Sequence, residues 1–203
     1  MKIRHFFRFT VAIAALAASF HTPATETPAA KASALFAGGC FWCIEADFEK
    51  LPGVIEVESG YTAGLTKSPS YEAVSAGKTG HTEAVRVIYN PQKVSYSQLV
   101  EYFWRHIDPT VKDRQFCDVG SQYRSGIYWQ NETEHKIAEA SRDTLLKSAR
   151  FPVIYTEVLA ASTFWPAEEY HQDYYKKNPI RYAYYRNGCG RDARVQQVWG
   201  ERK

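Results

Sequence analysis

The motif Gly-Cys-Phe-Trp-Cys at residues 39–43 constrains this chain most, because it places a pair of thiols where a strand turns into a helix. Residues 33–37 form a short apolar run that predicts a buried strand, and the glycines after it supply the turn. Apolar residues then recur at helical spacing over residues 44–51, until Pro-Gly ends the pattern. Cys40 is therefore expected at a helix N-terminus, where unpaired N–H groups and the helix dipole favour a thiolate.

Several kinds of site use a Cys-x-x-Cys pair, and the neighbouring residues separate them. A c-type haem site requires histidine directly after the second cysteine, where this chain has isoleucine. A structural zinc site requires a second close pair of ligands, whereas Cys117 and Cys189 stand alone. A thioredoxin-like dithiol stays open. The rings of Phe41 and Trp42 between the thiols are more typical of the wall of a small apolar pocket.

Four motifs occur in the order found in a known family. They are Gly-Cys-Phe-Trp (39–42), Tyr-Glu-Ala-Val (71–74) followed by Gly-His-Thr-Glu-Ala-Val-Arg-Val (80–87), Asp-Val-Gly-Ser-Gln-Tyr-Arg-Ser-Gly-Ile-Tyr (118–128) and Ala-Glu-Glu-Tyr-His-Gln-Asp-Tyr (167–174). In these motifs the chain resembles the peptide methionine sulfoxide reductases of the A type, from about residue 35 to about residue 199. The resemblance implies an α+β fold, a two-layer α/β sandwich with a ferredoxin-like core and an irregular C-terminal tail.

The resemblance also implies roles for individual residues, because reducing a sulfoxide requires a nucleophile at sulfur and an acid at oxygen. Cys40 would be the nucleophile and Glu83 the acid. Tyr71 and Tyr123 would donate hydrogen bonds to the oxygen, and Asp118 would border the site. Phe41 and Trp42 would form an apolar cage around the substrate methyl group. Without the resemblance, Glu83 on an alternating strand could face water, and Asp118 would suit a turn. His81 and His171 are interpreted as structural.

The reaction implied by the resemblance leaves a sulfenic acid on Cys40, which condenses with a nearby thiol. We expect Cys189 to be this resolving thiol, since it lies between glycines where family members keep a recycling cysteine. Cys43, one helical turn from Cys40, is the alternative, and Cys117 is expected to be a buried cysteine that lines the site. The competing function is an exported thioredoxin-like dithiol protein, or a soft-metal-binding protein, that uses Cys40 and Cys43.

The N-terminus has the pattern of a cleaved secretory signal. Lys2, Arg4 and Arg8 precede a short apolar run at residues 11–19, and small residues follow. We therefore expect a signal peptide and leader over residues 1–34, a catalytic domain over residues 35–203 and export, in a bacterium to the periplasm. The mature protein would have no membrane segment. In an oxidising compartment it would need a thioredoxin-type dithiol reductant as partner.

The composition limits the remaining classes. A net charge of +3 without a basic stripe excludes the pattern of a nucleic-acid-binding protein. About 170 residues after the leader are enough for one domain with a core. We expect a monomer that acts on methionine sulfoxide, free or in proteins, with no cofactor and no metal.

Hydrophobic periodicity gives a coarse set of elements. The strands are expected near residue 35, at 54–61, at 82–89, near 127 and at 153–160. The helices are expected from residue 40, at 97–106, at 132–148 with Thr133 as cap, and at 167–177. Alternating strands and helices of this kind indicate a two-layer α/β sandwich.

Overall fold

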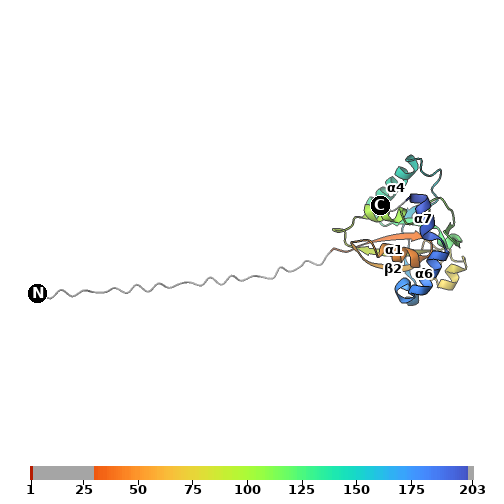
Figure 1. The fold of residues 1–203 in the computed structure, drawn as a ribbon, viewed down its shortest axis with the longest axis horizontal. Coiled ribbons are helices and arrows are strands. Elements are labelled where there is room, and N and C mark those ends of the chain that lie inside the picture. The colour runs from red at the N-terminus through yellow and green to blue at the C-terminus, as the bar shows by residue number, and fades with distance from the viewer. Residues whose placement is uncertain (2–29, 201–203) are drawn as a thin grey trace.

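A six-stranded mixed sheet organises the protein, in a computed structural model that describes Met1 and residues 30–200 (Figure 1). The strand order is β7-β6-β1-β3-β2-β8, so the first strand lies near the middle. The strands are β1 (Ala32–Gly38), β2 (Val54–Thr62), β3 (Thr82–Tyr89), β6 (Ser125–Trp129), β7 (Glu157–Ala160) and β8 (Trp165–Pro166). A separate ribbon pairs β4 (Arg114–Gln115) with β5 (Asp118–Val119).

The core of the sheet has ferredoxin-like topology. The chain runs β1, α1 (Phe41–Phe48), β2, β3, α3 (Tyr96–Trp104), β6, and the sheet order of these strands is β6-β1-β3-β2 with antiparallel neighbours. Helix α4 (Glu132–Lys147) then returns the chain so that β7 pairs parallel with β6. The α+β class and the two-layer sandwich that the resemblance implied are confirmed.

The main core lies between one face of the sheet and helices α1 and α3. The Phe36 ring on β1 stacks on Phe48 of α1 at 5.0 Å between centroids and on Phe103 of α3 at 5.1 Å. A smaller cluster, which includes Leu35 and Tyr128, lies on the other face of the sheet. Successive strand residues therefore contribute to opposite faces, as the pleat requires.

The expected elements agree with the structure where the periodicity is long. Residues 54–61 and 82–89 form β2 and β3, and the helix expected at 132–148 is α4, although Asn131 rather than Thr133 caps it by accepting from the Glu134 N–H. The strand expected at 153–160 is wrong over its first half, since only Glu157–Ala160 pairs with β6.

The continuous helix expected at 167–177 is also wrong. This segment contains the 3-10 turn η2 (Glu169–His171) and the short helix α5 (Tyr174–Lys177). Asp173 between them has a φ of 53°, in the left-handed region that ends a helix.

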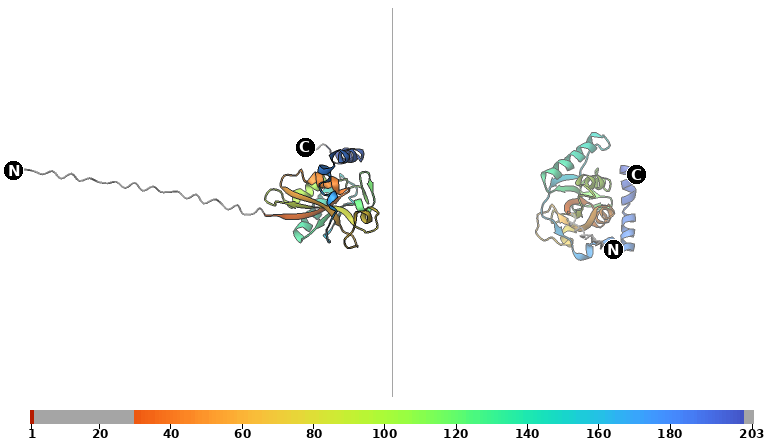
Figure 2. Two further views of the ribbon diagram at one scale, coloured as in Figure 1. Left: turned by 90° about the horizontal axis from the view of Figure 1, so that it is seen from below. Right: turned by 90° about the vertical axis from the view of Figure 1, so that its left-hand side faces the viewer.

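The irregular C-terminal tail is wrong as well, because the segment forms helices α6 (Pro179–Gly188) and α7 (Arg191–Trp199), drawn in blue along one side of the domain in Figure 2. The physical reason is tertiary. Asp47 on α1 is buried and lies 2.8 Å from Nη2 of Arg186 and 3.4 Å from Nε of Arg191. A buried carboxylate requires such partners, so these ion pairs hold both helices against α1.

The N-terminal boundary needs a further correction. Strand β1 starts at Ala32, and residues 32–36 pair with β3, so residues 32–34 belong to the sheet rather than to the leader. The rest of the predicted signal segment, residues 2–29 in particular, lies outside the described residues. Among those described, no helix has the length and apolar character needed to cross a membrane.

Candidate active site

Cys40 lies where the sequence places it, at the junction between β1 and α1. It is the N-cap residue of α1, and its carbonyl accepts the Cys43 N–H at 3.1 Å. Gly39 before it has a φ of 83°, and a Cβ there would come within 2.6 Å of Gln115. Only glycine allows this turn without strain, so the motif fixes the direction in which the Cys40 side chain leaves the strand.

The two thiols of the motif are in direct contact. Both cysteines are free and buried, and the Cys40 thiol donates a hydrogen bond to the Cys43 sulfur. Burial, followed by this bond, raises the pKa of Cys40. The bond lowers the pKa of Cys43, and the charges of Arg191 and Arg186 lower it further. The expected thiolate at Cys40 is therefore wrong for this structure, because desolvation outweighs the helix N-terminus.

Glu83 is buried beside the motif rather than facing water. It lies on β3, its side chain is 2% exposed, and its Oε2 accepts the Phe41 N–H at 3.0 Å. The pKa of Glu83 is raised to about 8, chiefly by burial. The Phe41 N–H bond opposes this rise, and the charges of Asp118 and Cys43 add to it. A carboxyl group of this pKa holds its proton at neutral pH and can donate it.

Tyr71 and Tyr123 belong to separate elements, and both lie near Glu83 and Cys40. Tyr71 begins α2 (Tyr71–Ser75), and Tyr123 ends the 3-10 turn η1 (Ser121–Tyr123). Burial raises the pKa of Tyr71 to about 12, and it raises the pKa of Tyr123 too, with the charge of Glu83 as the next cause in both. Both hydroxyls therefore remain protonated donors near the carboxyl group and Cys40.

The aromatic residues of the motif have different exposures. Phe41 is buried, and its ring centroid lies 5.0 Å from that of His171. Trp42 is half-buried and stacks on Tyr174 at 3.7 Å, while its indole N–H donates to Nδ1 of His171 at 3.0 Å. Burial lowers the pKa of His171, so it accepts this bond as a neutral ring. His171 thus positions Trp42, which agrees with a structural role.

Asp118 on β5 also lies in this group. Burial raises its pKa, and its Oδ2 accepts the hydroxyl proton of Tyr185 at 2.6 Å. The charges of Asp118 and Glu83 interact, which places the two carboxyl groups in one region. The structure therefore brings together Cys40, Glu83, Tyr71, Tyr123 and Asp118 from five elements.

Tyr185 is a site residue that the sequence analysis missed. Besides donating to Asp118, the Tyr185 hydroxyl lies beside the Cys40 thiol, and this polar contact lowers the pKa of that thiol. The segment that carries it was expected to be irregular. Had residues 179–188 been recognised as helical, Tyr185 would have stood one turn before Cys189 on the same face.

Replacing Tyr185 by phenylalanine should slow methionine formation about fivefold, which corresponds to the loss of about 1 kcal/mol from one hydrogen bond. Single-turnover rates measure this effect. The matched control is Tyr184→Phe, at a side chain that is 84% exposed, and equal rates for the two variants would show that Tyr185 has no role in the site.

Cys117 and Cys189 form a disulfide across 72 residues. Cys117 is exposed, so the expectation of a buried cysteine is wrong, since it lies in the tight turn between β4 and β5. Cys189 is the C-cap residue of α6 and pairs with Cys117 instead of with either cysteine of the motif. Among the described residues these two and Asp118 form a close group of metal-ligand type, but both sulfurs are bonded to each other and offer no thiolate.

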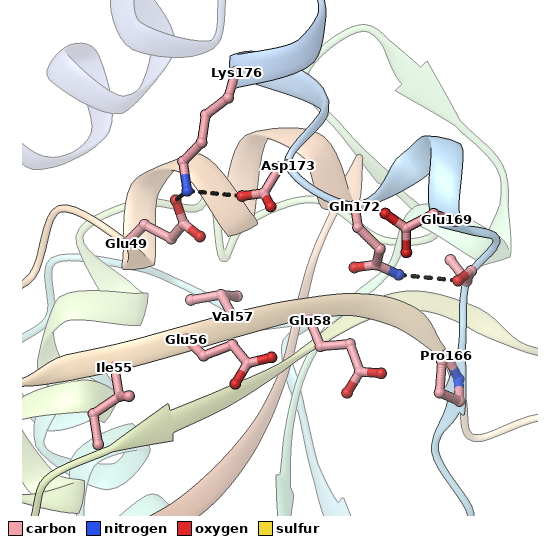
Figure 3. Close-up of a pocket in the computed structure, with 11 residues that line it drawn as sticks. Glu49, Ile55, Glu56, Val57, Glu58, Pro166, Glu169, Gln172, Asp173 and Lys176 are labelled. Carbon is pink, nitrogen blue, oxygen red and sulfur yellow. Dashed lines mark hydrogen bonds and ion pairs between the residues drawn. The ribbon is translucent and has the colours of Figure 1, made fainter.

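The cavity drawn in Figure 3 lies over β2, away from the thiols. It has a volume of about 480 Å³, and acidic side chains predominate in it. Its carboxylates include Glu49 and Asp173, both of which lie 2.7 Å from Lys176 Nζ. Neither a cysteine nor any candidate site residue lines it, so the chemistry belongs elsewhere.

Comparison with known sequences identifies close relatives over nearly the whole chain. Residues 32–203 match the family profile described as "Peptide methionine sulfoxide reductase". The chain is 47% identical over 192 residues to peptide methionine sulfoxide reductase MsrA 2 of Caulobacter vibrioides, covering 95% of this chain and 96% of that protein. It is 48% identical over 170 residues to MsrA of Bacillus licheniformis, covering 83% and 94%.

Solved structures show the same fold. Mxr1 from Saccharomyces cerevisiae in reduced form superposes with a TM-score of 0.69 at 32% identity, covering 77% of this chain and 90% of that one. Methionine sulfoxide reductase A of Corynebacterium diphtheriae superposes with a TM-score of 0.67 at 33% identity, covering 76% and 78%.

Proposed function

Because this chain belongs to the peptide methionine sulfoxide reductase family and is an oxidoreductase that reduces methionine sulfoxide, we propose that Cys40 carries the reaction with Glu83 as its acid. The observation that carries this assignment is the buried Glu83 carboxyl group, whose pKa of about 8 keeps it protonated beside the Cys40 thiol. A nucleophile for sulfur and an acid for oxygen are thus held in one poorly hydrated site.

In the chemical step, the Cys40 sulfur attacks the sulfoxide sulfur and Glu83 protonates the oxygen. The transient bond between the two sulfurs and the S–O bond of the substrate then break as the hydroxyl group passes to the Cys40 sulfur, and Glu83 regains a proton from the Cys40 thiol. The products are methionine and a Cys40 sulfenic acid, so cysteine sulfur is oxidised by two electrons and methionine sulfur is reduced by two. Tyr71 and Tyr123 donate hydrogen bonds to the oxygen as its negative charge develops.

The aromatic residues of the motif bind the substrate. The half-buried Trp42 ring and the buried Phe41 ring offer apolar contacts to the substrate methyl group, and Asp118 borders the site from β5. A methyl cage on one side and hydroxyl donors on the other distinguish the two epimers at sulfur. Resemblance to the family assigns the S epimer, and we extend this to free and protein-bound methionine sulfoxide.

Cys43 is the resolving thiol supported by the geometry, in place of the Cys189 favoured by the sequence. It already hydrogen-bonds Cys40, and its lowered pKa makes it the more ready thiolate. Its attack on the sulfenic acid forms the Cys40–Cys43 disulfide and releases water. Cys189 is held by Cys117 in this structure.

Replacing Cys43 by serine should leave the formation of the first methionine unchanged but prolong the lifetime of the Cys40 sulfenic acid at least about tenfold. Trapping with dimedone after one turnover, followed by mass spectrometry, measures this lifetime. The matched variant Cys189→Ser should resolve at the rate of the unmodified protein. Accumulation in Cys189→Ser and not in Cys43→Ser would assign resolution to Cys189.

The cycle requires an external reductant, since each turnover converts a pair of thiols to a disulfide. A thioredoxin-type dithiol protein fits this need, because it supplies two electrons and itself becomes a disulfide.

We also propose that the protein is exported. The basic and apolar residues near the N-terminus have the pattern of a secretory signal, which would place the mature enzyme in the periplasm of a bacterium. Fractionation of cells that produce the full chain should find a shortened protein outside the cytoplasm. Full-length protein confined to the cytoplasm would contradict export.

A further inference from the structure

Three side chains of zinc-ligand type meet at the Cys117–Cys189 disulfide. The two sulfurs and a carboxylate oxygen of Asp118 all lie within 4.8 Å of one another. Asp118 Oδ1 lies 3.7 Å from the Cys117 sulfur, and its Oδ2 lies 3.9 Å from the Cys189 sulfur. Thiolates and carboxylates are common ligands of Zn²⁺ in proteins. These residues therefore have the donor set of a zinc site once the S–S bond is opened.

The position of Asp118 also fits the shape of such a site. In a tetrahedral site with Zn–S of about 2.3 Å and Zn–O of about 2.0 Å, a sulfur and an oxygen lie about 3.5 Å apart. The two distances from Asp118 to the sulfurs, 3.7 Å and 3.9 Å, are close to this value. The main change on binding zinc is thus the separation of the two sulfurs after reduction.

The backbones that carry the two cysteines are held by contacts other than the disulfide. Cys117 lies in the turn between β4 and β5, which pair with each other. Cys189 ends α6, and Arg191 two residues later is 2% exposed. The Arg191 guanidinium donates to the carbonyl oxygens of Gly38 at 3.1 Å and His106 at 2.9 Å. The two cysteines should therefore remain neighbours after their disulfide is reduced.

Hydrogen bonds around the three side chains suit metal ligands. The Tyr185 hydroxyl donates to Asp118 Oδ2 at 2.6 Å, and ligating carboxylates are usually hydrogen-bonded in this way. The Cys117 N–H donates to the Cys189 sulfur at 3.2 Å, and such a bond stabilises a thiolate. Each ligand that would carry negative charge thus has a donor beside it or in the neighbouring turn.

An ion can reach these side chains from solvent. Cys117 is exposed, and Cys189 lines a cavity of about 360 Å³, which gives room for a water molecule as fourth ligand. Asp108 in that cavity is paired with Arg194 at 2.7 Å, so it does not compete for the ion. Cys40 and Cys43 are buried, and within residues 30–200 they belong to no close group of three ligand side chains.

We propose that Cys117, Cys189 and Asp118 bind one Zn²⁺ when their disulfide is reduced, with water as the fourth ligand. A small dithiol supplies two electrons and two protons, the S–S bond breaks, two thiols form, and the dithiol becomes a disulfide. Zn²⁺ then displaces both thiol protons as the thiolates coordinate it. The disulfide form does not bind zinc, because each sulfur is bonded to the other. The site is independent of sulfoxide reduction at Cys40, and the bound ion keeps the pair reduced.

Counting zinc tests the proposal. The variant Cys40→Ser/Cys43→Ser retains Cys117 and Cys189 as its only cysteines. Reduced with dithiothreitol and freed of it without air, this variant should bind about one Zn²⁺ per chain in a titration against a chromophoric chelator. Its disulfide form should bind none. No zinc on the reduced form, or equal zinc on both forms, would overturn the proposal.

A second count does not depend on the folding of that variant. Reduced Cys117→Ser/Cys189→Ser, which is altered at an exposed turn and a helix end, should bind about one Zn²⁺ fewer per chain than the reduced unaltered protein. Circular dichroism shows whether this variant is folded. Equal counts for the two proteins would contradict a site at Cys117 and Cys189.

Spectra with Co²⁺ in place of zinc identify the ligands. In reduced Cys40→Ser/Cys43→Ser, intense visible bands should indicate a tetrahedral ion and near-ultraviolet bands should indicate thiolate ligands. Asp118→Asn should weaken zinc binding at least about tenfold, since the loss of an outer partner alone has about this effect. The matched control is Asp113→Asn, at an exposed carboxylate before β4, which should bind zinc normally. Equal affinities for Asp118→Asn and Asp113→Asn would contradict Asp118 as a ligand.

Oxidation of the pair tests the effect of the ion. In reduced Cys40→Ser/Cys43→Ser, saturating Zn²⁺ should slow closure of the Cys117–Cys189 disulfide by diamide at least about tenfold, because coordinated thiolates are no longer free to react. A chelator should restore the rate. Mass spectrometry after alkylation measures closure. An unchanged rate with saturating zinc would show that the ion does not bind these thiols.

Discussion

Replacing Cys40 by serine should reduce methionine formation at least about a thousandfold, to the limit of detection. A serine hydroxyl is a hard, weakly acidic nucleophile and cannot accept the oxygen as a sulfenic acid does. Of the two buried thiols, Cys40 is the one at the helix start and in contact with Tyr185. Methionine production from a sulfoxide-containing peptide, measured by chromatography in a single turnover, gives the loss directly.

The matched control is Cys43→Ser, which removes the neighbouring thiol and keeps the nucleophile. It should form its first methionine at a rate within a few-fold of the unaltered protein. If Cys40→Ser were active and Cys43→Ser inactive, the assignment of nucleophile and resolving thiol would be reversed.

Replacing Glu83 by glutamine should lower the single-turnover rate by about a hundredfold to ten-thousandfold, the usual contribution of a general acid. Glutamine has nearly the same shape and its amide oxygen can still accept the Phe41 N–H, but it supplies no acidic proton. In the unaltered protein the rate should fall as pH rises through about 8, because Glu83 loses its proton there. This fall should be absent from the pH profile of Glu83→Gln.

The same substitution should stabilise the fold at high pH. The pKa of Glu83 is about 8 in the folded protein and about 4.5 in an unfolded chain. The folded state therefore holds a proton that the unfolded state has lost between these values, so stability falls as pH rises through this window. Glu83→Gln lacks this penalty and should gain a few kcal/mol at pH 8 and little at pH 4. A lower melting temperature than the unaltered protein at pH 8 would contradict the burial argument.

The parts of the fold that could be predicted from sequence are those set by local pattern. The glycine turn before Cys40 and the strand at residues 82–89 depend on neighbouring residues, and both are confirmed. Helices α6 and α7 depend on ion pairs to Asp47, more than 130 residues earlier in the chain, which local periodicity does not contain. The segment was therefore expected to be irregular, and Tyr185 was not predicted as a site residue.

The site residues also divide into those that the sequence identified and those that only the tertiary structure reveals. Resemblance to the family pointed to Cys40, Glu83, Tyr71, Tyr123 and Asp118, and the structure brings them together. Sequence alone left Glu83 free to face water, because its burial results from the packing of β3 beneath α1. The Cys117–Cys189 pairing joins positions 72 residues apart, so only the tertiary structure reveals it.

The most direct test of the central claim is a single-turnover experiment on the reduced protein, freed of reductant, with a peptide that carries each epimer of methionine sulfoxide in turn. We predict that the S epimer alone yields methionine, that mass spectrometry then finds a Cys40–Cys43 bond, and that Glu83→Gln yields methionine far more slowly. No methionine from either epimer, or equal rates for the unaltered protein and Glu83→Gln, would contradict the account.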